Sequence, residues 1–286
     1  MRSPNTTPIG AGYGEAALVR AAEAGIRAPS MHNAQPWLFG LRDGAIEIRV
    51  DPGRGGWAAR MACGAAACNA RLALAVAGQR ALVALHPDPA DRDLVARLMP
   101  GRPRPATSAE TALHAAIARR YSNRDPFRPA PVPAGMRAAL KEAARSEGAW
   151  LDLLVGTTAI AAFSEIARSA GRVLQRDAPL PGTPEELPGR LFVSHEPEPL
   201  LGVLGVSGDR AVDQIAAGLA MQKVLLTATA AGLDTSMISQ PIEVPAAGAL
   251  LRRALGRSGH PQMVLRFGYG TPGRPGPRRD VTDVLI

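Results

Sequence analysis

Lysine, histidine and aromatic residues are scarce in this chain of 286 residues. Lys141 and Lys223 are the only lysines, so almost all of the positive charge behind the formal net charge of +8 comes from arginine. The arginines are scattered rather than gathered in a basic run, and aromatic residues that would stack on bases make up only 4% of the chain. This distribution argues against a nucleic-acid partner.

Cysteine and histidine leave little material for cross-links or metal ligation. Cys63 and Cys68 lie about 140° apart around the axis of an expected helix, which suits neither a disulfide nor a zinc knuckle. The five histidines show no H-x-x-x-H spacing, so we expect no metal site. Two free thiols and no apolar signal region after Met1-Arg2 are typical of a cytoplasmic protein.

Long hydrophobic runs are also missing. No apolar stretch reaches the length of a membrane span, so we predict no membrane partner. Hydrophobic residues nevertheless make up 46% of the chain and charged residues 20%, which are values of a globular protein. The length is sufficient for one large or two ordinary domains with a substantial core.

The most distinctive polar stretch is 119–127, which reads RRYSNRDPF. Arg120, Ser122 and Arg124 form an R-x-S-x-R set. In an extended segment alternate side chains point the same way, so two guanidinium groups and a hydroxyl would converge on one dianionic phosphate. The same cations would equally serve the last carbonyls of a preceding helix and its dipole. The stretch alone does not decide between these readings.

A second polar stretch, 28–37, reads APSMHNAQPW. Prolines restrict the backbone near both ends, while Ser30, Asn33 and Gln35 supply short hydrogen-bonding groups. Such a loop would hold an amide-edged ring through paired hydrogen bonds. Alternatively, it is a turn whose polar side chains cap their own backbone.

The first half of the chain has a regular pattern of expected elements. These are a helix over 16–26, a hairpin with strands 38–42 and 45–50, a long buried helix over 57–77, a strand over 80–86 and a short helix over 88–98. Thr107-x-x-Glu110 is a capping box that opens a further helix. We therefore place a first half in 1–99, a proline-rich linker in 100–106 and a second half in 107–286.

The second half repeats part of this pattern. Its expected elements are helices over 134–147, 159–174 and 250–255, a second long buried helix over 209–231, and strands over 150–155, 200–206, 234–238 and 262–267. The proline-rich segment 177–189 is either a lid or surface ornament. Each long helix ends at a glycine and leads into a strand, which indicates two equivalent helices packed as a pseudo-twofold pair.

Four stretches together make the chain resemble the FMN-dependent nitroreductase superfamily, and most of all its Acg-like branch, whose members carry two such folds in tandem. The matching stretches are 28–37, 120–127, 217–240 and 259–285. The resemblance implies an α+β fold of two halves. Each half would have a mainly antiparallel sheet and a long buried helix, and the halves would pack as an intramolecular pseudo-dimer.

In this family the flavin site lies between two subunits. One subunit supplies the R-x-S-x-R anchor and the other supplies the A-P-S-x-x-N-x-Q-P-W loop. Here the first half has the loop but carries only Val19-Arg20-Ala21 near the position of an arginine motif. The second half has the motif, but its loop position, 146–150, reads SEGAW. The resemblance therefore implies one FMN per chain at the interface of the halves.

The resemblance also assigns residues to the phosphate side of this site. Arg120 and Ser122 would hold the phosphate, and one of Arg278 and Arg279 would complete the clamp. Arg124 would reach the ribityl chain or the N1/O2 edge of the ring. This agrees with the need to place two or three guanidinium groups against about two negative charges.

The ring side of the site is assigned in the same way. The residues that would line the ring and ribityl chain are Pro29, Ser30, Asn33 and Gln35, with Met31 in the same loop. The backbone around Ser239 and Gln240 would face flavin N5. We name no catalytic acid or base, because hydride chemistry belongs to the cofactor.

The resemblance is compatible with two functions. The first is NAD(P)H-dependent reduction of nitroaromatics or quinones by hydride transfer through flavin N5. The alternative is non-catalytic storage or sequestration of FMN beneath a lid. In both cases the partner is a small molecule, and the protein is expected to be a monomeric pseudo-dimer or a homodimer.

Overall fold

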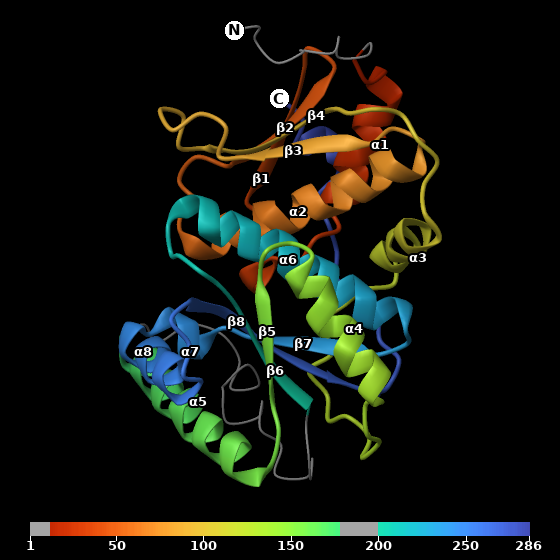
Figure 1. Cartoon of the computed structure of the whole chain (residues 1–286). Coiled ribbons are helices and arrows are strands. Elements are labelled where there is room, and N and C mark those ends of the chain that lie inside the picture. The colour runs from red at the N-terminus through yellow and green to blue at the C-terminus, as the bar shows by residue number, and fades with distance from the viewer. Residues whose placement is uncertain (1–11, 178–199) are drawn as a thin grey trace, which may run out of the picture. The chain divides into compact units, whose positions relative to one another are not determined.

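The computed structural model describes residues 12–177 and 200–286, which form two compact units (Figure 1). The first unit gathers Met1–Ala118, Arg210–Leu226 and Gly276–Ile286, and the second gathers Arg119–Asp209 and Thr227–Pro275. Each unit contains one four-stranded antiparallel sheet together with helices. The predicted α+β class is confirmed.

The sheet of the first unit has the order β1-β2-β4-β3, with every neighbouring pair antiparallel. Its strands are β1 (Trp37–Arg42), β2 (Ala45–Val50), β3 (Ala81–Leu85) and β4 (Leu94–Pro100). The predicted hairpin is present as β1 and β2. Asp43 and Gly44 between them have φ of 51° and 65°, the left-handed pair that a type I′ turn needs.

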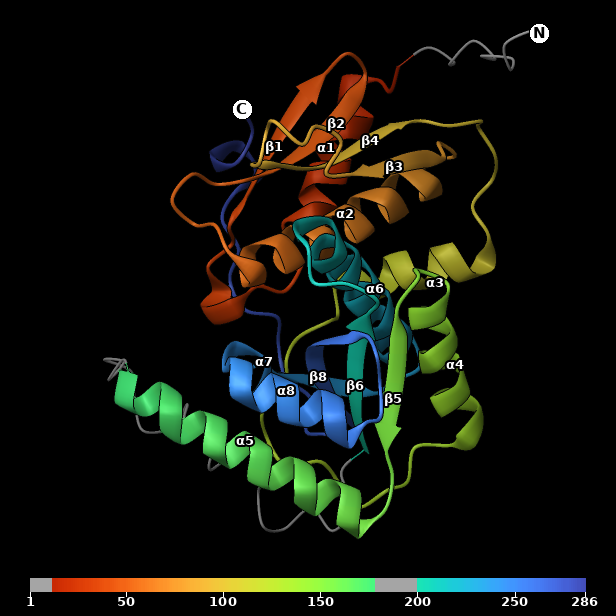
Figure 2. The ribbon, with the colours of Figure 1, turned by 60° about the vertical axis from the view of Figure 1, so that its left-hand side comes forward.

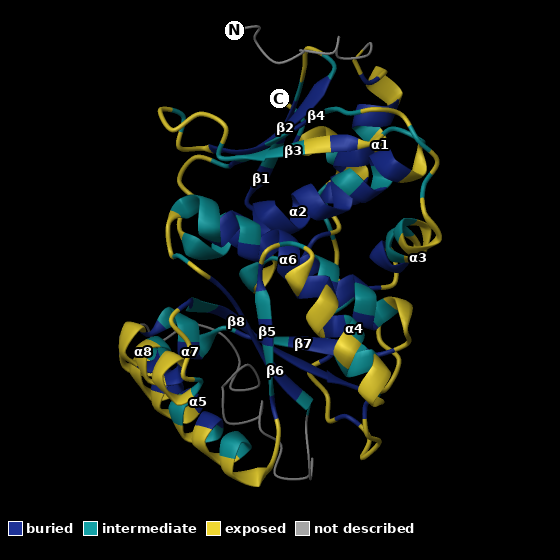
Figure 3. Ribbon diagram, viewed as in Figure 1, coloured by how far each residue is buried: buried dark blue, intermediate teal, exposed yellow. Residues whose placement is uncertain are grey.

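Helices α1 (Glu15–Gly25) and α2 (Trp57–Val76) pack on each other and against this sheet (Figure 2). Most of α2 is buried, as its apolar sequence predicts (Figure 3). The helix α3 (Ser108–Ile117) joins the same core, where Ile117 packs with residues of α2. The predicted capping box at the start of α3 is confirmed, since Thr107 and Glu110 satisfy each other's backbone N–H groups.

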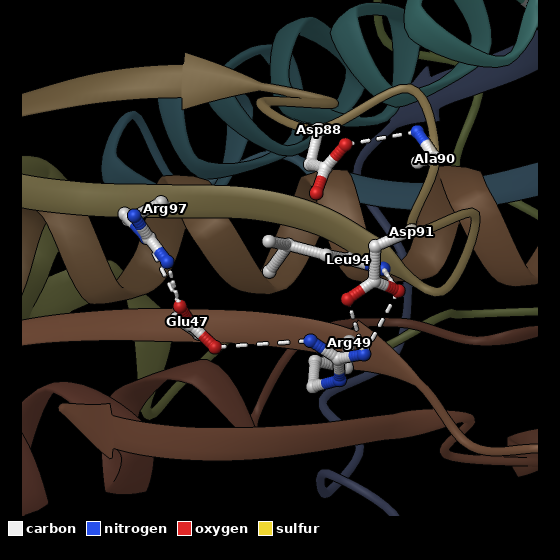
Figure 4. Close-up of polar contacts among 7 residues, drawn as sticks. All are labelled: Glu47, Arg49, Asp88, Ala90, Asp91, Leu94 and Arg97. Carbon is white, nitrogen blue, oxygen red and sulfur yellow. Dashed lines mark hydrogen bonds and ion pairs between the residues drawn. The ribbon is translucent and has the colours of Figure 1, made fainter.

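The expected short helix over 88–98 is wrong. A hydrogen-bonded turn over 88–94 leads instead into strand β4. In this turn Ala90 N donates to Asp88 Oδ1 at 2.9 Å and Leu94 N donates to Asp91 Oδ1 at 3.3 Å (Figure 4). The strand lies between β2 and β3 and pairs with both. Because this central place satisfies the backbone on two sides, tertiary pairing overrides the helical spacing of a short apolar run.

The segment predicted as a linker continues the structure of the first unit. Pro100 is the last residue of β4, Gly101 N donates to Arg80 O at 2.8 Å, and Arg104 N donates to Gly78 O at 3.3 Å. The compact units are discontinuous in sequence, so they do not coincide with the boundary predicted at 100–106. A division of the chain into consecutive halves stays a prediction.

The sheet of the second unit has the order β5-β6-β8-β7 and is also antiparallel throughout. Its strands are β5 (Trp150–Leu154), β6 (Leu200–Val206), β7 (Asp234–Ile238) and β8 (His260–Gly268). Its helices include α4 (Ala134–Arg145), α5 (Thr157–Asp177), α7 (Gln240–Glu243) and α8 (Pro245–Ala254). Helices α5 and α8 run side by side (Figure 2), and Phe163 and Leu251 bury against the strands. Apart from Asp177, the predicted lid over 177–189 lies outside the described residues.

The two sheets repeat one topology, including an irregularity. The pairing of β2 with β4 shifts register between Ile48 and Arg49, and the pairing of β6 with β8 shifts between Leu204 and Gly205. In both sheets the shift falls on the second strand where it meets the fourth. A shared bulge position together with a shared strand order indicates an internal repeat.

The long helices α2 and α6 (Ala211–Ala230) are the matching elements of this repeat. Within the first unit, a Cβ added to Gly64 of α2 would lie 2.1 Å from Ile215 O, and one added to Gly218 of α6 would lie 2.0 Å from Met61 O. Gly64 and Gly218 occupy the same position counted from the start of their helices, as do Met61 and Ile215. This exchange of contacts is the pattern of an isologous, two-fold related pair.

Candidate functional site

The loop between α1 and β1 has an unusual backbone. It contains the short 3-10 helix η1 (Met31–Asn33) and three non-glycine residues with positive φ, namely His32 at 51°, Asn33 at 54° and Gln35 at 47°. A left-handed non-glycine residue costs on the order of 1–3 kcal/mol and persists only where its surroundings hold it in place. The loop is therefore a strained segment on a rigid framework, which is typical of binding sites.

Contacts within the first unit hold part of this loop. Gln35 N donates to Ser30 Oγ at 3.0 Å, and Arg54 Nη1 donates to Ala34 O at 2.6 Å. The predicted reading as a self-capping turn therefore accounts for Ser30. Pro29 is buried and Met31 is half-buried, while Trp37, which follows the loop, is fully buried at the start of β1.

The C-terminal tail, 276–286, supplies the remaining contacts. Asn33 Nδ2 donates to Pro277 O at 3.1 Å, and Arg278 Nη1 donates to Asn33 Oδ1 at the same distance. Arg279 N donates to Gln35 Oε1 at 2.8 Å. The tail is itself fastened to β1, because Phe39 N donates to Val284 O at 2.7 Å. The structure thus brings together four of the predicted site residues in one unit.

The guanidinium group of Arg278 forms no ion pair with a carboxylate of the described residues. Its Nη2 donates to Ala28 O at 3.2 Å, and its Nε is buried without a hydrogen-bond partner in the described part of the chain. Burial lowers the pKa of Arg278, and the nearby charge of Arg27 lowers it further. Arg279 differs, since its guanidinium lies 3.9 Å from Asp51 and donates to Asp283 O. Arg278 is therefore the tail cation suited to an anionic ligand.

The R-x-S-x-R stretch belongs to the second unit and follows the edge of its sheet. Ser122 forms an isolated parallel bridge with Thr235 of β7, and Asn123 N donates to Thr235 O at 2.8 Å. The backbone is extended here, as the alternating pattern requires. Arg120 is buried, Ser122 is half-buried and Arg124 is exposed.

Arg266 of β8 braces this stretch from inside the second unit, and the sequence reasoning did not find it. Its side chain is 1% exposed, and its Nη2 donates to Asn123 O at 3.0 Å and to Asp125 O at 2.7 Å. Its guanidinium carbon lies 4.0 Å from the centroid of the Phe127 ring, a cation–π contact. The sequence signal that could have revealed it is a lone arginine inside the apolar run of β8. Such an arginine is buried with the strand and therefore needs hydrogen-bond partners of its own.

Tyr121 ties the same stretch to the segment after β8. Its hydroxyl donates to Thr271 O at 3.2 Å and accepts from Gly273 N at 2.8 Å. Burial and a hydrogen bond with Asp234 raise the pKa of Tyr121. Asp234 Oδ2 also accepts from Gly270 N at 2.8 Å. The Tyr121 hydroxyl thus fixes this stretch to the segment that follows β8.

Ser239 and Gln240 lie where β7 passes into α7 in the second unit. Ser239 is the N-cap residue of α7, and its carbonyl oxygen accepts from Ile242 N at 2.7 Å. Gln240 Oε1 is buried without a hydrogen-bond partner among the described residues. An acceptor left in this state is costly, so this amide oxygen is suited to a donor on a ligand.

Two absences were found within the described residues, 12–177 and 200–286. No group of three histidine, cysteine, aspartate or glutamate side chains is placed to hold a metal ion there. None of the helices in these segments is long and apolar enough to cross a membrane. Cys63 and Cys68 form no disulfide and both are buried, and burial raises the pKa of the Cys63 thiol.

The chain is similar to known proteins over most of its length. The family model described as the nitroreductase family matches residues 201–269. A Mycobacterium tuberculosis protein named "Putative NAD(P)H nitroreductase Rv3131" is 30% identical over 306 aligned residues, which cover 91% of this chain and 88% of that protein. The protein named "Putative NAD(P)H nitroreductase acg" from the same organism is 24% identical, with 93% and 94% covered.

A solved structure, that of a nitroreductase with bound FMN from Desulfitobacterium hafniense, matches with a TM-score of 0.49 and 15% identity and covers 61% of this chain and 97% of that one. The sequence relationship to these two Mycobacterium tuberculosis proteins covers 91% and 93% of this chain. On this relationship the chain belongs to the nitroreductase family, as its motifs predicted.

Proposed function

We propose that this protein is an FMN-dependent oxidoreductase. It would take hydride from NAD(P)H and reduce a small acceptor, a nitroaromatic or a quinone. Bound FMN supplies the hydride chemistry through its N5 atom. Family membership supports the reaction class, and the single observation that carries the cofactor assignment is Arg278, a half-buried cation without a carboxylate beside the loop that the family uses for flavin.

The polar groups left over in each unit fit FMN. Arg278 in the first unit and Arg124 in the second are cations with no carboxylate partner among the described residues. Gln240 Oε1 is a buried acceptor without a donor in the same part of the chain. A flavin mononucleotide offers a phosphate carrying about two negative charges for the cations and ring and ribityl donors for the acceptor.

We assign both sets of residues to one FMN per chain, because each set occurs once in the sequence. Arg120, Ser122 and Arg124 would bind the phosphate and ribityl groups together with Arg278. Pro29, Ser30 and Met31 of the loop would provide the ring side, with the backbone around 239–240 near N5. The isologous contact of α2 and α6 supports a pseudo-dimer in which one chain does the work of two subunits.

The residues of this chain would act by binding and orientation. Guanidinium groups would hold the phosphate as charge-assisted donors, and a cation beside the ring would stabilise negative charge on it. Bound FMN would carry the hydride from NAD(P)H to the small acceptor, which would also take up a proton from solvent. Two buried cysteines that form no disulfide support a reducing, cytoplasmic location.

The first test is the flavin content of the purified protein. We expect a yellow protein that releases one FMN per chain on denaturation. Arg124→Ala should weaken FMN binding about tenfold or more, because it removes a charge-assisted contact. Arg119→Ala is the matched control, since Arg119 is exposed in the same stretch but lies outside the R-x-S-x-R set. A wild-type protein that neither contains nor takes up FMN would refute the assignment.

The second test separates turnover from storage. Anaerobic mixing with NADPH should bleach the visible absorbance of the bound flavin, and a nitroaromatic or quinone should restore it. A flavin spectrum that stays unchanged with both NADH and NADPH would contradict the reductase and favour sequestration of FMN.

A further inference from the structure

We propose that the side-chain amides of Asn33 and Gln35 are positioning residues that act through the C-terminal tail. They would set the place of Arg278 and of the tail backbone at Arg279 rather than contact the flavin ring themselves. This inference rests on the proposed FMN site and changes the role that the family resemblance implies for these two amides.

Asn33 uses both ends of its amide on consecutive tail residues. Its Nδ2 donates to Pro277 O at 3.1 Å, while its Oδ1 accepts from Arg278 Nη1 at 3.1 Å. An amide that is bonded at both ends to neighbouring residues of another segment fixes the register of that segment, because a slip by one residue breaks both bonds. Both polar ends of the Asn33 side chain are thus hydrogen-bonded to the tail.

Gln35 adds a second point of attachment two residues further along the loop. Its Oε1 accepts from Arg279 N at 2.8 Å, and its side chain is buried. Asn33 and Gln35 both adopt left-handed backbone angles, which cost free energy and are retained where the surroundings hold them. His32 is left-handed as well, but it is exposed and makes no hydrogen bond or ion pair with the tail among the described residues.

The result of these contacts is a fixed guanidinium group. Arg278 is held by Asn33 on one nitrogen and by Ala28 O on another, and its buried Nε keeps an N–H without a partner in the described part of the chain. Burial and the neighbouring Arg27 lower the pKa of Arg278, so an anion at this point would stabilise the charged form. A terminal phosphate is the group of FMN that meets this need.

FMN and riboflavin are the paired probes for this inference, because they differ only by the phosphate. Asn33→Gly removes the amide while allowing the left-handed backbone. We expect it to weaken FMN binding to the flavin-free protein about tenfold or more, as for loss of a charge-assisted contact, and to leave riboflavin binding unchanged within about twofold. His32→Gly is the matched control, with the same backbone change in the same loop, and should alter neither affinity.

A double variant tests whether Asn33 acts through Arg278. Arg278→Met should show the same loss that is confined to FMN, and adding Asn33→Gly to Arg278→Met should cause no further loss. Asn33→Asp should weaken FMN more than Asn33→Gly does, because a carboxylate would neutralise Arg278. Thermal unfolding of each variant reports on the fold separately.

Three results would overturn the inference. Equal losses of FMN and riboflavin affinity in Asn33→Gly would mean that the amide contacts the ring or ribityl chain. Unchanged affinities for both flavins would mean that the tail does not need the amide. Additive losses in the double variant would mean that Asn33 and Arg278 act separately. A wild-type protein that binds neither flavin would instead refute the proposed function itself.

Discussion

The two sheets share one strand order, yet the segments that lead into their first strands are very different. Before β1 the chain forms the strained polar loop over 26–36. Before β5 it needs only residues 146–149, a helix-ending turn in which Gly148 has φ of 76° and Ala149 N donates to Ala144 O at 3.1 Å. Equivalent frameworks thus carry different loops, and the candidate chemistry lies in the loop rather than in the fold.

The arginines of the fourth strands show the same contrast. In the first sheet Arg97 of β4 forms an ion pair with Glu47, which also lies 3.8 Å from Arg49, so charge is balanced between neighbouring strands (Figure 4). In the second sheet Arg266 of β8 donates to backbone carbonyls of the R-x-S-x-R stretch. One arginine stabilises its own sheet, and the other positions a segment outside the sheet.

The largest expected effect tests the equivalence of α2 and α6. Gly64→Ala and Gly218→Ala should each lower the free energy of unfolding by about 3 kcal/mol, since each Cβ would lie near 2 Å from a carbonyl oxygen of the other helix. Denaturant unfolding measures this. Gly135→Ala in α4, where a Cβ meets nothing within 4 Å, should instead raise stability by about 0.5–1 kcal/mol. Markedly unequal losses of stability in the Gly64 and Gly218 variants would show that α2 and α6 are not equivalent.

Removing the two arginines tests their different roles. Arg266→Met should lower the free energy of unfolding by about 2 kcal/mol and also weaken FMN binding, because the carbonyls of Asn123 and Asp125 lose their donor. Arg97→Met should affect stability alone. Unfolding curves and FMN titrations on both variants decide the matter. If Arg97→Met weakens FMN as strongly as Arg266→Met, the contrast between the sheets does not hold.

A smaller effect on stability is expected from the residues with left-handed backbone angles in the two loops before β1 and β5. Gly148→Ala should lower the free energy of unfolding by about 1 kcal/mol, because alanine is strained at φ of 76°. His32→Gly should raise it by about 0.5 kcal/mol by relieving a strained residue. Thermal unfolding of both variants checks the signs. A loss of stability in His32→Gly would show that the imidazole is needed by the loop.

The smallest effect concerns helix ends, where α3 has a capping box and α4 begins at Pro133 without a side-chain cap. A hydrogen bond from Arg104 is the main cause that lowers the pKa of Glu110 from 4.5 to about 2. Its contribution is therefore fully present above about pH 4.5 and is lost as the pH falls toward 2. Glu110→Gln should lower the free energy of unfolding by about 0.4 kcal/mol at neutral pH, because glutamine keeps the capping box and loses only the ion pair with Arg104, and it should remove this part of the acid dependence of unfolding. If the acid dependence of unfolding is unchanged in this variant, Glu110 does not make this contribution to stability.

Local chemistry explains which elements were predictable. The Asp43-Gly44 turn, the capping box at Thr107 and the glycine endings of the long helices each depend on a few adjacent residues, and all are present. Strand β4 was missed, because its place between two other strands is set by residues far away in the sequence. Arg266 was missed for the same reason, since its partners in 123–127 are more than a hundred residues away.

The sequence by itself determined the family, the α+β class and the residue types of the candidate site, because motifs and short-range patterns record these directly. Only the tertiary structure decided what those residues touch. The amides of Asn33 and Gln35 meet a tail 244 residues later in the chain. The physical reason is that hydrogen bonds between distant segments depend on how the sheet brings those segments together, and no local pattern of side chains encodes that.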